Sequence, residues 1–317
     1  MRRLICLFAA TIMAGTSTAC TMSAPADQPA YTRAAPASAA HLDPPRHRTH
    51  PARNRQLLIP SGPPLAALGR PAEMNALFLL AAGEGPHPTM VLLHGLPGNE
   101  RNLDLAQAVR RAGWNVLTFT YRGAWGSEGT FSIGAALEDA GAALAYVRSP
   151  AAAREYAIDP RRLVIAGHSM GGLAAAWQGA ADDALAGVIL LDAWDIGTTA
   201  RGIADGGAGA QAAFAAGLDD LGHAIGPVSG AQLAEEVARR GSGWSLAQTA
   251  DGLARKPVLS IYAAHGLAAE NRAFAALLSG RHGAQVSAAE LDSDHSFADH
   301  RLALAEEVVR WLEALGR

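Results

Sequence analysis

One serine of this 317-residue chain stands between glycines at the end of an apolar run. The segment "VIAGHSMGGLAAA", residues 164 to 176, places Ser169 after a β-compatible stretch and before an alanine-rich, helix-compatible one. Gly167 and Gly171 have no side chains to collide where strand and helix approach each other, so the turn can be sharp. The spacing is that of the G-x-S-x-G turn, which predicts an outward-facing, nucleophilic Ser169 hydroxyl.

Short apolar runs alternate with helix-compatible segments along most of the chain. The expected strands are Ala76–Ala81, Thr89–His94, Asn115–Tyr121, Leu163–Gly167, Gly187–Leu191, Pro257–Ala263 and Gln285–Leu291. Helices are expected at about 102–112, 132–148, 170–181, 270–281 and 298–315. This order predicts an α/β fold, with helices flanking a mostly parallel central sheet.

Residues 197 to 252 interrupt the alternation. The interval begins with a Gly-rich stretch and then shows helical patches around Gln211–Leu221 and Ala231–Arg240. An insertion of this length between two strands predicts a helical cap or lid.

Composition excludes some classes of partner. Half of the residues are hydrophobic, which is enough for a sizeable core. With 26 basic and 29 acidic residues the net charge is -3, so the chain has no general attraction for phosphate backbones and nucleic acid is not an expected partner.

We expect no cofactor and no metal, because no G-x-G-x-x-G follows a strand and no ligand cluster has convincing spacing outside residues 21 to 55.

The first residues have the pattern of a secretory signal. Arg2 and Arg3 precede an apolar run and then small residues, so we interpret residues 1–20 as a signal peptide. Cys20 in "STAC" partly resembles a lipobox, which would lipidate that cysteine and attach the chain to a membrane. Residues 21–55 are expected to be a flexible linker, and residues 56–317 the folded domain. The expected location is the cell envelope, through lipidated Cys20, or the periplasm or medium.

Two further segments place chemistry near Ser169. "VLLHGLPGNERN" ends a predicted strand and would supply a backbone N–H, from Leu96, beside that of Met170. "LDSDHSFADH" follows the last predicted strand and offers His295 as a base of near-neutral pKa. His300 is less suitable because we expect it within the last helix. Asp292 and Asp294 are expected to order the loop.

With these segments the chain resembles the α/β-hydrolase superfamily over about residues 70 to 317. "HGLPGNERN", "YRGAWGSEG", "GHSMGG" and "DHSFADHR" are most similar to the branch of serine aminopeptidase-like and monoglyceride-lipase-like hydrolases. The resemblance implies Ser169 as nucleophile, His295 as base, and Leu96 and Met170 as oxyanion donors.

The acid that this family pairs with the base is absent from its usual place. The loop after Pro257–Ala263 reads "YAAHGLAAEN", with His265 and Gly266 where an aspartate is expected. Some lipases of the superfamily carry the acid after the preceding strand, where "VILLDAWD" has Asp192, which we take as the first candidate. Asp195 and Glu270 remain alternatives, as does the absence of a functional acid.

The sequence therefore predicts an exported serine hydrolase that cleaves carboxylic esters through an acyl-serine intermediate. One alternative is a peptide or amide hydrolase, in which Glu235, Glu236, Asp219 or Asp220 would hold a substrate amino terminus. The other is a degenerate, non-catalytic member that binds an acyl ligand or an envelope partner.

Overall fold

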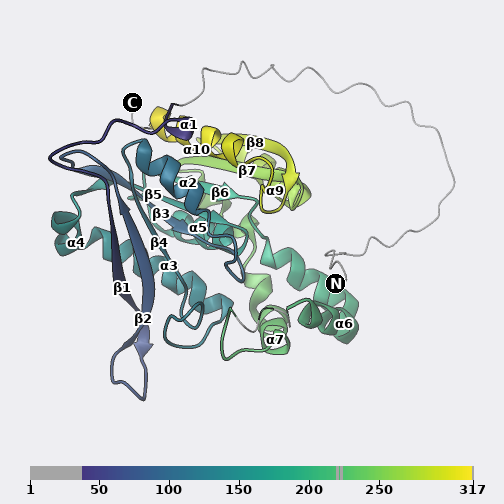
Figure 1. Ribbon diagram of the computed structural model, residues 1–317. Helices are drawn as coiled ribbons and strands as arrows, with labels where there is room; N and C mark the ends of the chain where they lie inside the picture. The colour runs from purple at the N-terminus through teal and green to yellow at the C-terminus, as the bar shows by residue number, and fades with distance from the viewer. Residues whose placement is uncertain (1–37, 219–220, 222–223, 316–317) are drawn as a thin grey trace, which may run out of the picture. The chain divides into compact units, whose positions relative to one another are not determined.

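The computed structural model describes residues 38–218, 221 and 224–315 (Figure 1). The chain divides into two units, Met1–Ala35 and Pro36–Arg317. The expected signal peptide, Cys20 and the first part of the expected linker lie outside the described residues, so these assignments stay predictions. No helix of the described part is long and apolar enough to cross a membrane.

A single eight-stranded sheet organises the second unit, in the order β1-β2-β4-β3-β5-β6-β7-β8. Only β2 runs antiparallel to its neighbours, β1 and β4, and all other pairs are parallel. The strands are β1 (Arg53–Pro64), β2 (Pro71–Leu80), β3 (His87–Leu93), β4 (Asn115–Phe119), β5 (Ile158–His168), β6 (Gly187–Leu191), β7 (Pro257–His265) and β8 (Gln285–Asp294).

Helices cover both faces of the sheet and give two apolar layers. One layer packs α3 (Ile133–Arg148) and α5 (Met170–Ala181) against the sheet, and the other packs α2 (Leu103–Arg111) and α10 (Arg301–Leu315). Every residue of β4 and β6 is buried, as expected for strands covered on both sides. The remaining helices are α1 (Ser38–His41), α4 (Pro150–Glu155), α6 (Ile196–Leu218), α7 (Gly230–Arg240), α8 (Ala250–Leu253) and α9 (Ala268–Ser279).

The α/β prediction is confirmed, and each expected strand overlaps an observed one. The first strand was missed, because β1 is an edge strand with mostly exposed residues and only Ile59 and Ser61 buried. It begins at Arg53, inside the segment expected to be linker. The helix α1 also lies in that segment, where it contacts α2 and α10 and buries Ala40. The folded part therefore begins earlier than expected.

The interval from 197 to 252 is more helical than its sequence suggested. The helix α6 starts at Ile196 and continues through the Gly-rich stretch, with one non-helical residue at Gly207. The Asp195 carboxylate accepts a hydrogen bond from the Gly197 N–H at its first turn, which stabilises this start. Two 3₁₀ turns, Gly241–Gly243 and Leu246–Thr249, connect α7 to α8.

A buried ion pair joins the loop after β4 to the helix α3. Asp139 on α3 is fully buried and lies 2.5 Å from the Arg122 Nε that donates to it. The same carboxylate accepts hydrogen bonds from the Arg122 N–H and the Ser61 hydroxyl on β1. Its lone pairs are thus occupied by three donors, which offsets part of the cost of burying the charge.

We predict that Asp139→Ala lowers the free energy of unfolding by about 3–5 kcal/mol, because it removes the buried carboxylate that pairs with the Arg122 Nε and leaves this buried arginine with the exposed Glu138 as its carboxylate partner. Glu138 is the other carboxylate that pairs with Arg122, and the Glu138 side chain is 66% exposed. Glu138→Ala should therefore lower the free energy of unfolding by less than about 1 kcal/mol. Denaturant unfolding of both variants measures the difference. Equal losses would mean that the pair does not stabilise this junction.

Candidate active site

Ser169 lies on a strained turn between β5 and α5. Its φ of 57° is in the left-handed region, and its N–H donates to the Leu191 carbonyl at 3.0 Å. The flanking glycines are sterically required: a Cβ on Gly167 would lie 1.9 Å from the Gly171 carbonyl oxygen, and one on Gly171 would lie 2.5 Å from the His94 carbonyl oxygen. Strand and helix therefore approach too closely for any other residue at these two positions.

Loop residues after β3 lie against the serine. A Cβ on Gly95 would come within 2.9 Å of the Ser169 Cβ, so the loop that carries Leu96 contacts this turn directly. The Tyr121 hydroxyl donates to the His94 carbonyl at 3.0 Å, and the Trp125 indole N–H donates to the Pro97 carbonyl at 2.7 Å. Leu96 thus lies in a loop held at both ends beside Ser169.

Met170 is the first residue of α5. The N–H groups of a first helical turn have no partner within their own helix, and the helix dipole places partial positive charge there. The position suits an N–H that stabilises a negative oxygen next to Ser169.

Asp192 contacts His295. The Asp192 Oδ2 lies 2.5 Å from the His295 Nδ1, and the carboxylate is fully buried at the end of β6. It also accepts hydrogen bonds from the Ala263 and Leu267 N–H groups at 3.0 to 3.2 Å. Because a carboxylate only accepts, His295 carries a hydrogen on Nδ1, which leaves its Nε2 as the basic nitrogen.

His168 connects His295 to the serine turn. Its Nε2 donates to the His295 carbonyl at 2.7 Å, and the two rings pack with centroids 4.6 Å apart at an interplanar angle of 38°. His168 immediately precedes Ser169, so the contact holds the loop of His295 beside the serine. The sequence pattern does not indicate this role, although His168 occupies the second position of the G-x-S-x-G motif.

The two alternative acids have other partners. Asp195 accepts hydrogen bonds from Gly197, Ser245 and Leu246, and so joins the start of α6 to the second 3₁₀ turn. Glu270, in the first turn of α9, accepts one from the Asp195 N–H at 3.3 Å, and burial raises the pKa of its carboxyl. Neither carboxylate contacts His295.

Other titratable residues of the final segment do not join the site. Asp294 accepts from the Ser296 and Ala298 N–H groups and orders the loop, whereas Asp292 pairs at 2.9 Å with the exposed His265. Both aspartates lie in β8, which is longer than expected. His300 precedes α10, so its expected position within that helix is wrong, and its Nδ1 lies 3.0 Å from Asp299.

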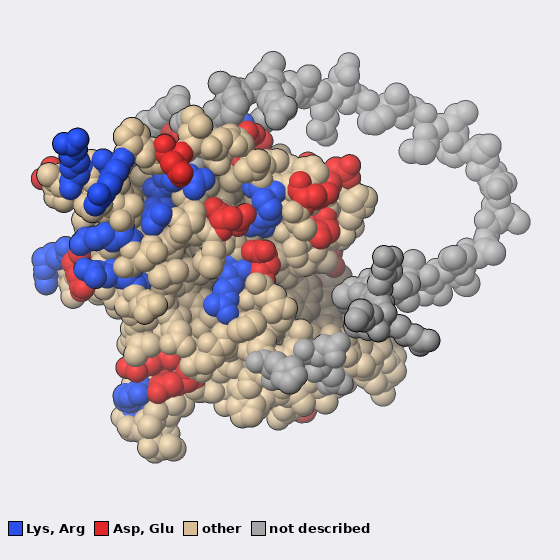
Figure 2. Space-filling model, in the orientation of Figure 1, with Lys and Arg blue, Asp and Glu red and all other residues tan. Residues whose placement is uncertain are grey.

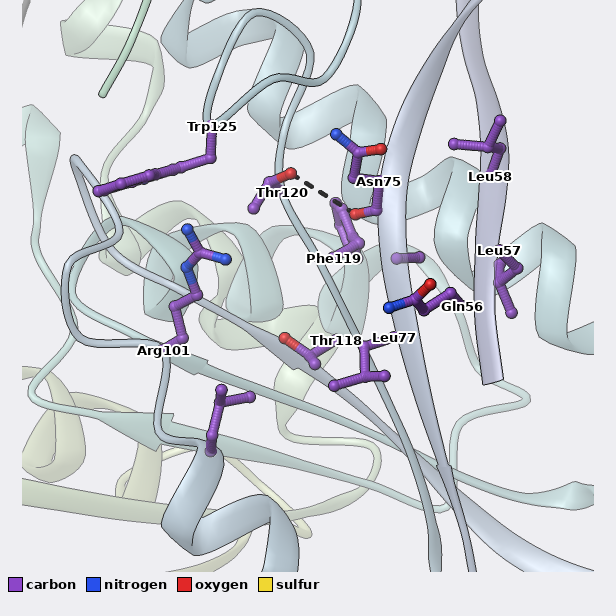
Figure 3. Close-up of a pocket in the computed structure, with 12 residues that line it drawn as sticks. Gln56, Leu57, Leu58, Asn75, Leu77, Arg101, Thr118, Phe119, Thr120 and Trp125 are labelled. Atoms are coloured by element: carbon purple, nitrogen blue, oxygen red, sulfur yellow. Dashed lines mark hydrogen bonds between the residues drawn. The ribbon is translucent and has the colours of Figure 1, made fainter. Parts of the chain in front are cut away.

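A large hollow is lined by neither Ser169 nor His295. It encloses about 570 Å³ against β1, β2 and β4, where Arg101 stacks on Trp125 at 4.7 Å (Figure 3). In Figure 2 the Lys and Arg side chains lie mainly at the upper left of the displayed face, with some Asp and Glu among them, and a group of acidic side chains lies at its upper right. Among the described residues, no group of three or more His, Cys, Asp or Glu is placed to hold a metal ion.

Comparisons with known proteins agree with this architecture. A model described as the alpha/beta hydrolase family matches residues 90–307. Est1E from Butyrivibrio proteoclasticus superposes with a TM-score of 0.59 at 16% identity, over 82% of this chain and 98% of that one. Brefeldin A esterase, a bacterial homologue of human hormone-sensitive lipase, gives 0.57 at 22% identity, over 87% and 78%.

A third solved structure is a peptidase. The acylaminoacyl peptidase of Pyrococcus horikoshii gives a TM-score of 0.55 at 17% identity, with 83% of this chain covering 41% of that one. A comparison with curated proteins found no match. At these identities the likenesses show a shared fold.

Two buried histidines make stability depend on pH. Burial lowers the pKa of His94 and of His168 from 6.5 to about 4. Between these values the unfolded chain binds protons that the folded chain does not, so stability is full above about pH 6.5 and falls as the pH drops toward 4.

We predict that the fall in unfolding free energy between pH 7 and pH 5 is about 2 kcal/mol smaller in His168→Gln than in the unmodified chain. Glutamine keeps an N–H donor for the His295 carbonyl but cannot titrate. Urea unfolding at the two pH values measures the change, with the exposed His282→Gln as control. An unchanged pH dependence in His168→Gln would contradict the prediction.

Proposed function

Because this chain belongs to the alpha/beta hydrolase family, we propose that it cleaves carboxylic esters through an acyl-Ser169 intermediate. The observation that carries the proposal is the contact between the buried Asp192 carboxylate and His295 Nδ1, next to the strained turn of Ser169. The contact leaves the His295 Nε2 available as a base beside a turn of the kind that carries nucleophilic serines.

In the first half of the proposed reaction, the Ser169 Oγ attacks the ester carbonyl carbon while His295 Nε2 takes the hydroxyl proton. The carbonyl oxygen becomes an oxyanion that accepts hydrogen bonds from the Leu96 and Met170 N–H groups. Collapse of this intermediate breaks the bond to the alcohol oxygen, which receives the proton from His295. The products of this half are the free alcohol and the acyl-Ser169 ester.

Water completes the reaction. His295 Nε2 takes a proton from the water as its oxygen attacks the acyl carbon, and the second intermediate collapses when Ser169 recovers that proton. The acyl group leaves as a carboxylic acid. Asp192 keeps the imidazole in one tautomer and stabilises its cationic form during both halves. Removing the acid from a comparable triad lowers turnover by about 10⁴-fold.

The peptidase alternative has weaker support. Glu236 accepts hydrogen bonds from the Ile133 and Gly134 N–H groups at the start of α3, and Glu235 lies 3.7 Å from Arg239. Both carboxylates therefore have partners other than a substrate amino terminus. Asp219 and Asp220 lie outside the described residues.

The non-catalytic alternative was motivated by the missing acid after β7. The contact of His295 with Asp192 weakens that motive, because it provides a carboxylate from the preceding strand. Export, lipid attachment at Cys20 and a location in the cell envelope remain part of the proposal on the sequence pattern alone.

We expect Ser169→Ala to lower turnover of p-nitrophenyl acetate by about 10⁴-fold or more, because the substitution removes the atom that is acylated. Release of p-nitrophenolate measures turnover, and circular dichroism verifies folding. Ser287→Ala, on the exposed side of β8, is the matched control and should behave like the unmodified chain. A folded Ser169→Ala variant with undiminished turnover would refute the proposal.

A further inference from the structure

Gly266 occupies the position after β7 where the family resemblance leads one to expect an acid. Its φ lies outside the left-handed region, so backbone conformation does not require glycine there. Space does require it. A Cβ on Gly266 would lie 2.2 Å from the Asp192 Oδ2, which is the oxygen that contacts His295.

The chain around Gly266 folds about the Asp192 carboxylate. The Ala263 and Leu267 N–H groups, on either side of Gly266, both donate to that carboxylate. The Gly266 N–H donates to the Ala263 carbonyl at 3.0 Å and closes the turn between them. The carboxylate therefore fills the space into which a side chain at position 266 would project.

We propose that Gly266 is a positioning residue of the site, because its missing side chain leaves the volume in which Asp192 reaches His295. The proposal rests on the proposed function only for its kinetic consequence. It also explains why position 266 carries no acid: a side chain there and the Asp192 carboxylate exclude each other.

The neighbouring His265 does not share this constraint. Its side chain is 70% exposed and pairs with Asp292 on the surface, away from Asp192. Of the two residues found in place of an acid, the glycine is thus the one whose identity matters. His265 provides a matched control one position away.

We expect Gly266→Ala to lower kcat/KM for p-nitrophenyl acetate by about 100-fold or more, because the methyl group displaces the Asp192 carboxylate from His295. His265→Ala should stay within about threefold of the unmodified chain, since that side chain is exposed and pairs with Asp292 on the surface. A one-dimensional proton spectrum gives a second readout without substrate. The downfield resonance of the His295 Nδ1 hydrogen should disappear in Gly266→Ala and persist in His265→Ala.

A double-mutant cycle separates positioning from general damage to the loop. In an Asp192→Ala background the oxygen that the new methyl group would meet is absent. Adding Gly266→Ala to that background should therefore lower kcat/KM by a further factor of less than about ten. The cycle allows for the His295 Cα and Ala263 Cβ, which would lie 3.0 and 3.1 Å from the new methyl group in either background. An equal fold-loss in both backgrounds would overturn the proposal.

Two other outcomes also decide it. Full activity and an intact His295 resonance in Gly266→Ala would overturn the proposal. If Gly266→Ala alone does not fold, a folded Asp192→Ala/Gly266→Ala variant supports the steric conflict and an unfolded one contradicts it. Should the unmodified chain not hydrolyse the ester, the proposed function fails, whereas the resonance still tests the role of Gly266.

Discussion

The contact between Asp192 and His295 is the interaction on which the rest of the site depends. A fully buried carboxylate is costly unless its lone pairs are occupied, and here the imidazole and two backbone N–H groups occupy them. The same three donors fix where the carboxylate lies. The contacts that compensate the buried charge of Asp192 therefore also orient His295, and a small movement of any of these donors would disturb both.

The parallel sheet brings these groups together because adjacent strands end at the same edge. Ser169 follows β5, Asp192 follows β6, Gly266 follows β7 and His295 lies just beyond β8, and these four strands are consecutive neighbours in the sheet. The loop of Leu96 follows β3, which pairs with β5 on the other side. Residues more than a hundred positions apart thus meet at the carboxyl ends of the strands, where ligands bind in open α/β sheets.

The sequence indicated this arrangement well where local pattern and topology agree. Apolar runs such as "GVILL" identified the strands buried on both faces, and the glycines around Ser169 indicated a turn whose close packing the structure explains. The edge strand β1 gave too little apolar signal, because it packs few of its residues. The first half of α6 was also hidden, since its stability comes from contacts of Asp195 and from the buried Ile196, Ala200 and Ile203 rather than from its Gly-rich composition. Its second half overlaps the helical patch expected from Gln211.

The sequence put Asp192 first among the carboxylates, from its place after a strand, but kept Asp195 and Glu270 as alternatives. Asp192, Asp195 and Glu270 all stand near strand or helix ends, and spacing alone does not tell which one reaches the imidazole. The answer depends on a steric detail at Gly266 and on the backbone donors around it, which only the folded chain brings into contact.

The rate at which a fluorophosphonate labels Ser169 tests the central claim most directly, because labelling requires an activated hydroxyl and is independent of the substrate. The account predicts labelling about 10³–10⁴-fold slower in Asp192→Asn and nearly unchanged in Glu270→Gln, with mass spectrometry locating the adduct on Ser169. The reverse ranking, or a folded chain that the reagent does not label at all, would contradict it.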